Sequence, residues 1–130
     1  MELDKALPGP HTRTLYDNRT RREAAILAQL RSGYCRLNKY LHSIRAVESN
    51  RCECGQVETV QHVMIECPRW AVARREHLTP LGSRANQLSY LLGGYQNEQL
   101  DGPIDKWKPN MEAVLKSIDF AQATGRLDRD

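Results

Sequence analysis

The sequence predicts a single, mainly helical domain organised around a Cys3His zinc knuckle. Apolar residues recur at helical spacing along most of the chain, whereas alternating strand patterns are nearly absent. One short stretch, "RCECGQVETVQHVMIEC" (51–67), holds three of the four cysteines and a histidine. Apolar residues make up 40% of the 130 residues and charged residues 27%, a balance typical of a globular protein. We therefore expect residues 1–130 to form one domain without internal repeats.

The leading half is expected to contain a loop and two helices. Residues 1–18 are assigned to an N-terminal loop, because "LPGPHTRTLYDN" is rich in Pro and Gly. In 19–50, Thr20 and Glu23 form a capping box that starts the first helix, and Gly33 ends it. Its apolar face consists of Ile26, Leu27 and Leu30. The second helix, "CRLNKYLHSIRAV", places Leu37, Leu41 and Ile44 on one face, and we expect the two helices to pack together.

Residues 71–130 are expected to be C-terminal helices. A helix in "PRWAVARREHL" would bury Trp70, Val72 or Ala73, and Leu78, while Arg74 and Arg75 point outward. "QLSYLLGG" predicts a short helix, and an unpatterned segment, "YQNEQLDGPIDKWK", follows it. The last helix, "PNMEAVLKSIDFAQATG", ends at a glycine and has one apolar face formed by Met111, Val114, Leu115, Ile118 and Ala121.

Residues 51–70 carry the strongest functional signal, a set of metal-ligand residues. Cys52, Cys54, His62 and Cys67 have the spacing C-x-C-x7-H-x4-C, and Cys3His is a usual structural zinc set. Gly55 follows the first pair and permits the sharp turn that a metal-wrapping loop needs. The alternative is a chance cluster or core packing. We expect one Zn²⁺ ion, with all four positions filled by protein, which is the arrangement of structural rather than catalytic sites.

The second ligand pair depends on where its helix ends. In a continuous α-helix, His62 and Cys67 would lie about 140° apart around the axis at roughly 100° per residue. Pro68 disfavours helical angles at Cys67, so the helix should end near Glu66 and let the thiol turn back. Thr59 is the expected N-cap of this helix.

The expected cellular compartment indicates whether the cysteines form disulfides, and Cys35 is considered separately. The chain shows no hydrophobic signal sequence and no run long enough to cross a bilayer, so we expect an intracellular protein without a membrane partner. Reducing compartments keep thiols free, which favours metal over disulfides. Cys35 lies outside the cluster and is expected to be a small buried apolar residue, although a role as substitute ligand stays open.

Several stretches resemble a known family. "HTRTLYD", "REAAILAQLRSGYCRLNKYLHSIRAVES", "CECGQVETVQHVMIECPRW", "RREHL", "LSYLLGG" and "ATGRLD" resemble the C-terminal zinc-binding region of fungal non-LTR retrotransposon reverse transcriptases. The resemblance implies that Cys52, Cys54, His62 and Cys67 bind zinc and that the region handles RNA or target DNA. The paired-aspartate motif of the polymerase and the carboxylates of RNase H do not precede it, so we expect a truncated or free-standing copy without polymerase activity.

The charge distribution favours nucleic acid as the partner. Residues 1–50 carry nine Lys and Arg against five Asp and Glu, residues 51–85 five against four, and residues 86–130 five against seven. A basic leading half suits weak, non-specific binding of RNA or DNA, although a solvated helix gives the same pattern. Tyr34 and Tyr40 offer stacking faces if they are not part of the core. The candidate cations are Arg19, Arg21, Arg22, Arg31, Arg36, Lys39 and Arg45.

The sequence also suggests a function class other than nucleic-acid binding and argues against another. The alternative is a protein-interaction module, such as a repurposed fungal effector that binds a host protein, because the final third is acidic and the loop around Tyr95 to Trp107 is long. Trp107 would anchor a partner unless it folds back onto the last helix. An enzyme is not expected, because no His and carboxylate pattern is tied to Cys35, the one candidate nucleophile outside the knuckle.

Overall fold

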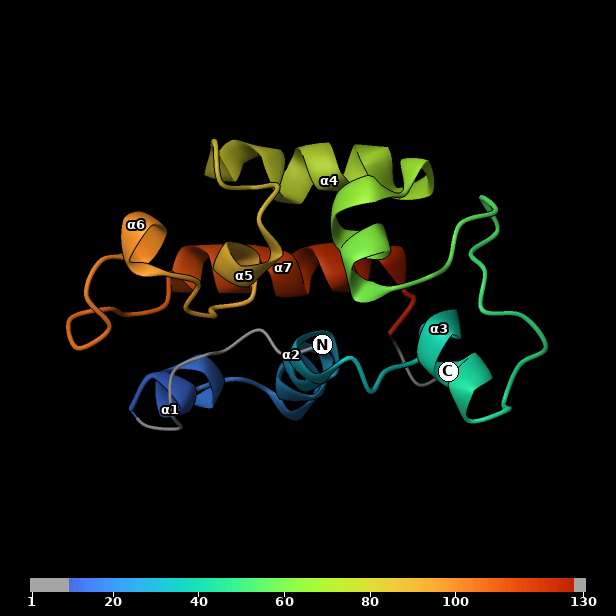
Figure 1. Ribbon diagram of the computed structural model, residues 1–130, viewed down its shortest axis with the longest axis horizontal. Helices are drawn as coiled ribbons and strands as arrows, with labels where there is room; N and C mark the ends of the chain where they lie inside the picture. The colour runs from blue at the N-terminus through green and yellow to red at the C-terminus, as the bar shows by residue number, and fades with distance from the viewer. Residues whose placement is uncertain (1–9, 128–130) are drawn as a thin grey trace.

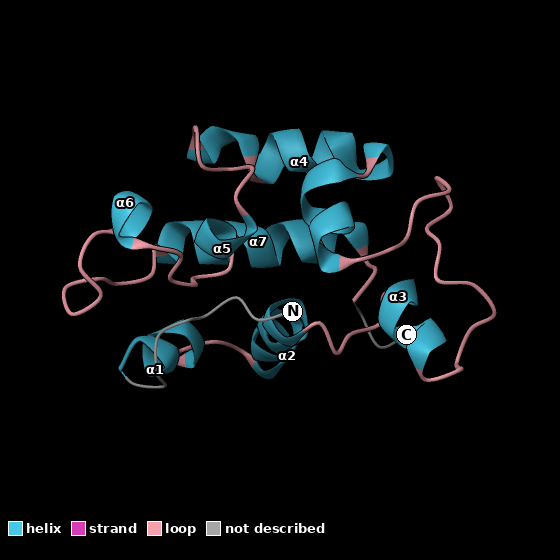
Figure 2. Cartoon of the chain, viewed as in Figure 1, coloured by secondary structure: helices cyan, strands magenta, loops and turns pink. Residues whose placement is uncertain are grey.

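The computed structural model describes residues 10–127 and is mainly helical, as the sequence predicts. Within these residues there is no strand, only an isolated antiparallel bridge between Arg51 and Val57 (Figure 2). No helix of this part of the chain is long and apolar enough to cross a membrane. The elements are α1 (Pro10–Tyr16), α2 (Arg21–Ser32), α3 (Asn38–Ser43), the π-helix η1 (His62–Glu66), the 3₁₀ turns η2 (Pro68–Trp70) and η3 (Thr79–Leu81), α4 (Ala71–His77), α5 (Leu88–Leu91), α6 (Glu98–Asp101) and α7 (Met111–Thr124).

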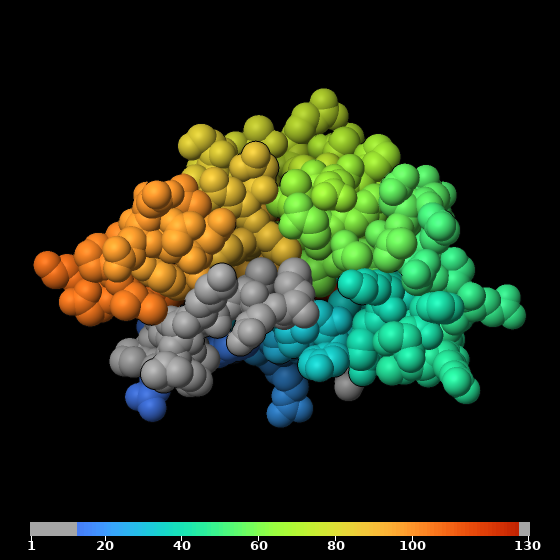
Figure 3. All heavy atoms as spheres, in the orientation of Figure 1, coloured from blue at the N-terminus to red at the C-terminus, as the bar shows by residue number. Residues whose placement is uncertain are grey.

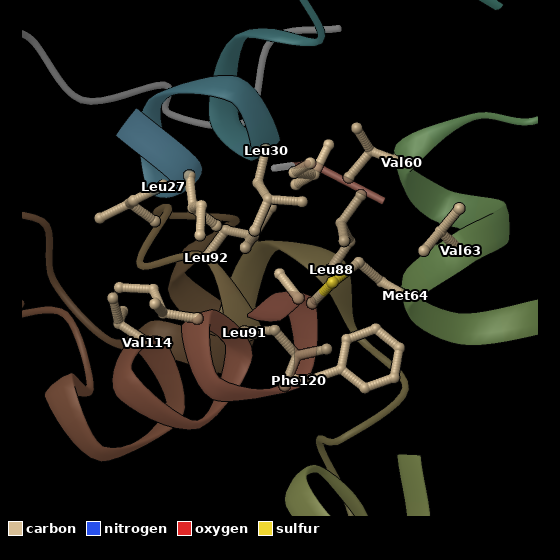
Figure 4. Close-up of a cluster of buried hydrophobic side chains, with 14 of the residues drawn as sticks. Leu27, Leu30, Val60, Val63, Met64, Leu88, Leu91, Leu92, Val114 and Phe120 are labelled. Carbon is tan, nitrogen blue, oxygen red and sulfur yellow. The ribbon is translucent and has the colours of Figure 1, made fainter. Parts of the chain in front are cut away.

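The C-terminal helix α7 lies at the centre of the fold. It packs against α4 on one side and against α5 and α2 on the other (Figure 1). Its buried face is wider than the predicted one, because Ala113, Ser117 and Phe120 are buried with Val114, while Leu115 is exposed. The core joins α2, α5 and α7 to the ligand-bearing segment, as Leu30, Leu92, Val114, Phe120, Val63 and Met64 show (Figure 4).

Helix α1 corrects the prediction of an N-terminal loop at residues 1–18. Residues 1–9 of that loop lie outside the described residues, but the chain is helical from Pro10 to Tyr16. Proline is favoured at the first position of a helix, where its missing N–H costs nothing. Leu15 is fully buried in the core, and this burial stabilises a short helix that the Pro and Gly content of the sequence obscures.

The two helices predicted in residues 19–50 are present, with one difference in length. Helix α2 has the predicted capping box between Thr20 and Glu23 and ends at Gly33. Helix α3 is shorter than predicted, and Ile44 at its end is exposed instead of buried. Helix α2 packs mainly against α7, so the expected pairing with α3 is not the main contact of α2.

A glycine at the end of α5 determines how α1 docks. Gly93 has φ 72°, and a Cβ atom there would lie 2.5 Å from Leu15 Cδ2 and 3.1 Å from Val114 Cγ2. Only glycine combines this left-handed backbone with so close an approach. Gly93 therefore allows α1 to pack closely against the core.

The segment between α5 and α7 is ordered by polar contacts rather than by a long helix. Arg84 Nη2 lies 3.0 Å from Asp101 Oδ1, and the guanidinium lies over the Tyr90 ring at 4.7 Å. Trp107 is half-buried and packs edge to face on Tyr95, with ring centroids 5.5 Å apart. Residues 95–108 form one end of the long axis of the molecule, and residues 34–55 form the other (Figure 3).

Candidate metal centre

The four predicted ligands converge on one point. The donor atoms of Cys52, Cys54, His62 and Cys67 all lie within 4.8 Å of one another. Cys54 is half-buried and the other three residues are buried. None of the four cysteines forms a disulfide. These residues are positioned to bind a metal ion.

The distances between donor atoms fit a tetrahedral ion. Bonds of about 2.3 Å to sulfur and about 2.0 Å to nitrogen place two sulfurs about 3.8 Å apart and a sulfur and a nitrogen about 3.5 Å apart. In the structure, Cys52 Sγ lies 3.6 Å from Cys67 Sγ, Cys67 Sγ lies 3.9 Å from Cys54 Sγ, and Cys54 Sγ lies 3.2 Å from His62 Nε2. These three separations are therefore close to those that such an ion imposes, and all four donors lie within 4.8 Å of one another.

The first pair of ligands sits on a tight turn closed by backbone hydrogen bonds. The Gly55 N–H donates to the Cys52 carbonyl at 2.9 Å, and the Cys52 N–H donates to the Gln56 carbonyl at 2.7 Å. Gly55 has φ 100°, a conformation that other residues adopt only with strain. Arg51 Nη1 donates to the Gly55 carbonyl at 2.7 Å and holds the turn from outside. The turn presents Cys52 and Cys54 on the same side.

The second pair is brought together by a π-helix, which sequence reasoning did not foresee. The Cys67 N–H donates to the His62 carbonyl at 2.7 Å, five residues back. This i→i−5 bond places the two residues one turn apart, so the 140° separation of an α-helix does not arise. The predicted features on either side are present: Thr59 Oγ1 accepts from the His62 N–H at 2.9 Å, and Cys67 has extended angles before Pro68.

Arg74 supports the π-helix from within the fold, although the sequence suggested that it points outward. Its guanidinium donates to the carbonyls of Met64, Val63 and Cys67 at 2.9, 2.9 and 3.1 Å. Carbonyl groups at the end of a helix have no partner within the helix, so they need donors from elsewhere. The partial burial of Arg74 lowers the pKa of its guanidinium. Arg74 thereby fixes the backbone that carries the third and fourth ligands.

The thiols differ in how readily they ionise. Burial opposes ionisation of Cys52, but hydrogen bonds from the Cys54 amide, from Arg69 and from His62 outweigh burial and lower the pKa of Cys52 to about 6. Arg69 Nη1 lies 3.2 Å from Cys52 Sγ. Burial and the neighbouring thiols raise the pKa of Cys67 to about 11. At neutral pH one ligand is thus a thiolate before metal arrives, while Cys67 must give up its proton to bind.

The imidazole of His62 faces a carboxylate on its far side. His62 Nε2 points to Cys54, and His62 Nδ1 lies 3.8 Å from Glu66 Oε1, one turn along the chain. Metal-bound histidines commonly use the other ring nitrogen to contact a carboxylate, which fixes the tautomer. The distance is too long for a direct hydrogen bond, but it places a carboxylate beside Nδ1 of the ring.

A buried carboxylate links the metal centre to α3 and to the end of α7. Arg126 Nε and Nη2 donate to Glu58 Oε2 and Oε1 at 3.0 and 2.6 Å. The Asn38 N–H at the start of α3 donates to Glu58 Oε1 at 2.8 Å, and the Lys39 N–H donates to the Glu58 carbonyl at 3.1 Å. Asn38 Nδ2 also donates to the Arg51 carbonyl at 2.7 Å. Helix α3 is therefore fixed directly onto the ligand-bearing segment.

Sequence reasoning missed the residues that support the ligands. Glu58, Arg69 and Arg126 have no role in the sequence-based prediction, Arg74 was expected to point outward, and no local pattern connects Glu58 to a partner near the C-terminus. A role for Arg69 beside the ligands could have been inferred from the sequence, because Arg69 directly follows Cys67 and Pro68. Cys35 is buried in the core with a pKa raised by burial, as expected for a residue that is not a ligand.

The predicted basic residues do not form one uniform surface. Arg31 Nη1 donates to the Leu92 carbonyl, and the Nε atom of the half-buried Arg19 is out of contact with solvent. Arg31 is thus bonded within the fold, and part of the Arg19 guanidinium is buried. Arg21, Arg22, Arg36, Lys39 and Arg45 are exposed.

The chain was also compared with known proteins. No protein-family model, curated protein or solved structure matches it.

Proposed function

We propose that this protein is a zinc-stabilised nucleic-acid-binding module without catalytic activity of its own. In this proposal it acts in a reducing, intracellular compartment, as an accessory domain of the type found at the end of non-LTR reverse transcriptases. The observation that carries the proposal is that exposed cations lie on the element fixed to the metal centre. Lys39 is on α3, and Arg36 and Arg45 flank that helix.

The metal proposed for this site is zinc. Three thiolates and an imidazole form a soft, tetrahedral donor set, which zinc takes in structural sites. The protein supplies all four donors, so the ion stabilises the fold and has no open position for water. Binding of the ion is then largely folding free energy.

The metal centre would arrange the cations through Glu58. Because Glu58 accepts from the Asn38 amide, the start of α3 is held at a fixed place beside the ligands. Lys39 follows Asn38, and its own amide is also bonded to Glu58. Zinc therefore favours nucleic-acid binding indirectly, by ordering the segment from which these side chains project.

Binding to RNA and DNA across a salt series, with zinc quantified in the same sample, tests the proposal. If four phosphates are contacted, the logarithm of the duplex association constant should fall with the logarithm of salt concentration with a slope of about −3 to −4. The double variant Arg36→Ala/Lys39→Ala should weaken binding and flatten this slope by about 2. Lys106→Ala removes an exposed cation from the opposite end and is the matched control. Zinc-loaded protein that binds neither RNA nor DNA would refute the proposal.

A second candidate function, protein binding, is favoured by apolar exposure at the other end of the molecule. Leu100 and Ile104 are 44% and 49% exposed in the segment that also carries Trp107. A repurposed effector would use such a surface to contact a host protein. Pull-down of one defined partner by wild-type protein, and its loss with Leu100→Asp/Ile104→Asp, would support this function. A monomeric protein that retains no partner would weaken it.

A further inference from the structure

An aromatic pair lies at the end of the molecule that carries the metal centre. Tyr34 and Tyr40 pack edge to face, with ring centroids 5.3 Å apart and ring planes at 76°. Tyr34 is 71% exposed and Tyr40 is half-buried. The alternative from the sequence, that both are core residues, is therefore wrong for Tyr34. The ring of Tyr34 is therefore accessible to a binding partner.

Two cations lie between the tyrosines in the chain. Arg36 and Lys39 are both exposed, and neither forms an ion pair with the residues that the structure describes. Ile44 follows Tyr40 by one helical turn and is 53% exposed. Aromatic faces with interleaved cations are the combination that binds unpaired bases and their phosphates.

The surface is held in place before any ligand arrives. Tyr34 follows Gly33, the left-handed residue that ends α2, and its N–H donates to Ser32 Oγ at 3.1 Å. The Arg36 N–H donates to Gln29 Oε1 at 3.2 Å. Together with the Asn38–Glu58 contact, these bonds fix both ends of the segment 34–39 and reduce the ordering cost of binding.

We infer that the Tyr34–Tyr40 pair is a stacking platform that makes the protein prefer single-stranded over double-stranded nucleic acid. This inference rests on the proposed function. Bases in a duplex are covered on both faces by neighbouring base pairs, so their faces are not available to Tyr34. The bases of a single strand are free to stack, and the strand runs past Arg36 and Lys39, which contact its phosphates.

The angle between the rings adds a geometric requirement. A continuous stack of bases has parallel planes, whereas the two tyrosine rings are nearly perpendicular. Two bases that stack on the two rings must therefore be turned away from each other. Flexible pyrimidine strands meet this requirement most easily, because their bases stack weakly on one another. Stacking does not read the sugar, so RNA and DNA strands are equivalent ligands here.

The test uses fluorescence anisotropy with zinc-loaded protein and two labelled probes at one salt concentration. The probes are a 12-nucleotide thymidine strand and a 12-base-pair duplex. We expect the strand to bind more tightly than the duplex. Tyr34→Ala should lower affinity for the strand by about tenfold or more and leave the duplex within about twofold, because each stacked base contributes roughly 1 to 3 kcal/mol. Tyr34→Phe keeps the ring and should bind the strand like wild type.

The outcomes separate this inference from the function on which it rests. Salt-dependent binding of both probes with no preference, or equal losses for both probes in Tyr34→Ala, would overturn the platform and keep nucleic-acid binding. Binding of neither probe would overturn both. Zinc content and circular dichroism are measured for each variant to test whether it is folded. If Tyr34→Ala does not fold, Tyr34→Ser is used in its place, and the same criteria apply to it.

Discussion

Arg126 binds Glu58 with two hydrogen bonds of 2.6 and 3.0 Å, across 68 positions of the chain. Glu58 is 1% exposed and Arg126 is 30% exposed. The Glu58 amide is bonded as well, to the Asn50 carbonyl at 2.9 Å. The contact joins the end of α7 to the segment between the two ligand pairs, so the C-terminal helix and the metal centre stabilise each other.

Removal of Arg126 should therefore destabilise the whole domain. Arg126→Ala leaves the Glu58 carboxylate buried with the Asn38 amide as its remaining donor, and we expect a loss of about 3 kcal/mol. The measurement is urea unfolding of the zinc-loaded protein. In the double variant Glu58→Gln/Arg126→Ala the buried charge is absent, so its loss should be smaller than the sum of the two single losses. Additive losses would show that the two side chains do not interact.

Removal of a ligand should unfold much of the protein. Cys54→Ser or His62→Ala leaves three donors, and since structural zinc binding is largely folding free energy, the cooperative thermal transition should be lost or strongly lowered. Cys35→Ala is the matched control, because it removes the one cysteine outside the site. That variant should keep one zinc ion and lose on the order of 1 kcal/mol. Unchanged thermal stability of Cys54→Ser would contradict a structural metal site.

Arg74 should contribute to metal affinity without touching the metal. Arg74→Met leaves three carbonyls around the π-helix without their side-chain donor, and we expect zinc affinity to fall about tenfold to a hundredfold. Arg74→Lys should recover little, because a single ammonium cannot reach all three oxygens as the guanidinium does. Competition with a chromophoric chelator measures the affinity. Arg75→Ala, an exposed neighbour, should change it by less than twofold.

Metal affinity should rise with pH in a defined way. The pKa of Cys67 is raised to about 11, so at pH 7 this thiol is protonated and must release a proton to bind. Each thiol proton released on binding lowers the zinc Kd about tenfold per pH unit, so the Kd should fall at least tenfold per unit between pH 6 and pH 8. The pKa of Cys52 is lowered to about 6, so below that pH an additional proton competes and the dependence steepens. A Kd that is flat from pH 6 to pH 8 would contradict these assignments.

Gly93 should tolerate no side chain. In Gly93→Ala the new methyl group would lie 2.5 Å from Leu15 Cδ2 on a left-handed backbone, and we expect a loss of about 2 to 4 kcal/mol in urea unfolding. Gly125→Ala separates the two causes, since Gly125 has φ 69° in the left-handed region with open space around it. That variant should lose about 1 kcal/mol. If the two glycine variants lost equal stability, the short distance between Gly93 and Leu15 of α1 would not add to the cost of a side chain at Gly93.

The features that could be predicted from the sequence are those specified by neighbouring residues. The capping box at Thr20, the stop at Gly33 and the ligand set of the knuckle depend on short spacings, and each is present. The end of the second ligand helix was also predictable, because Pro68 restricts Cys67 through direct contact.

The features that were not predicted depend on distant parts of the chain. Arg74 lies inside because it meets three carbonyls of another element, and helical periodicity does not report them. Helix α1 forms because Leu15 is buried against the turn at Gly93, far away in sequence. The π-helix also could not be predicted from the sequence, since the i→i−5 hydrogen bond that defines it competes with an α-helical hydrogen bond of similar strength.

If the site holds zinc as proposed, the irregular stretch between Ser43 and Val60 would tie the lifetime of the protein to its metal supply. This stretch contains no helix, and it is held by the ligands, the Arg51–Val57 bridge and Glu58. Arg45 and Arg51 lie exposed within it and are cleavage sites for trypsin-like proteases. When the ligands release the ion, the stretch is free to fit a protease active site. On the proposed function, loss of zinc would therefore lead to degradation of the molecule.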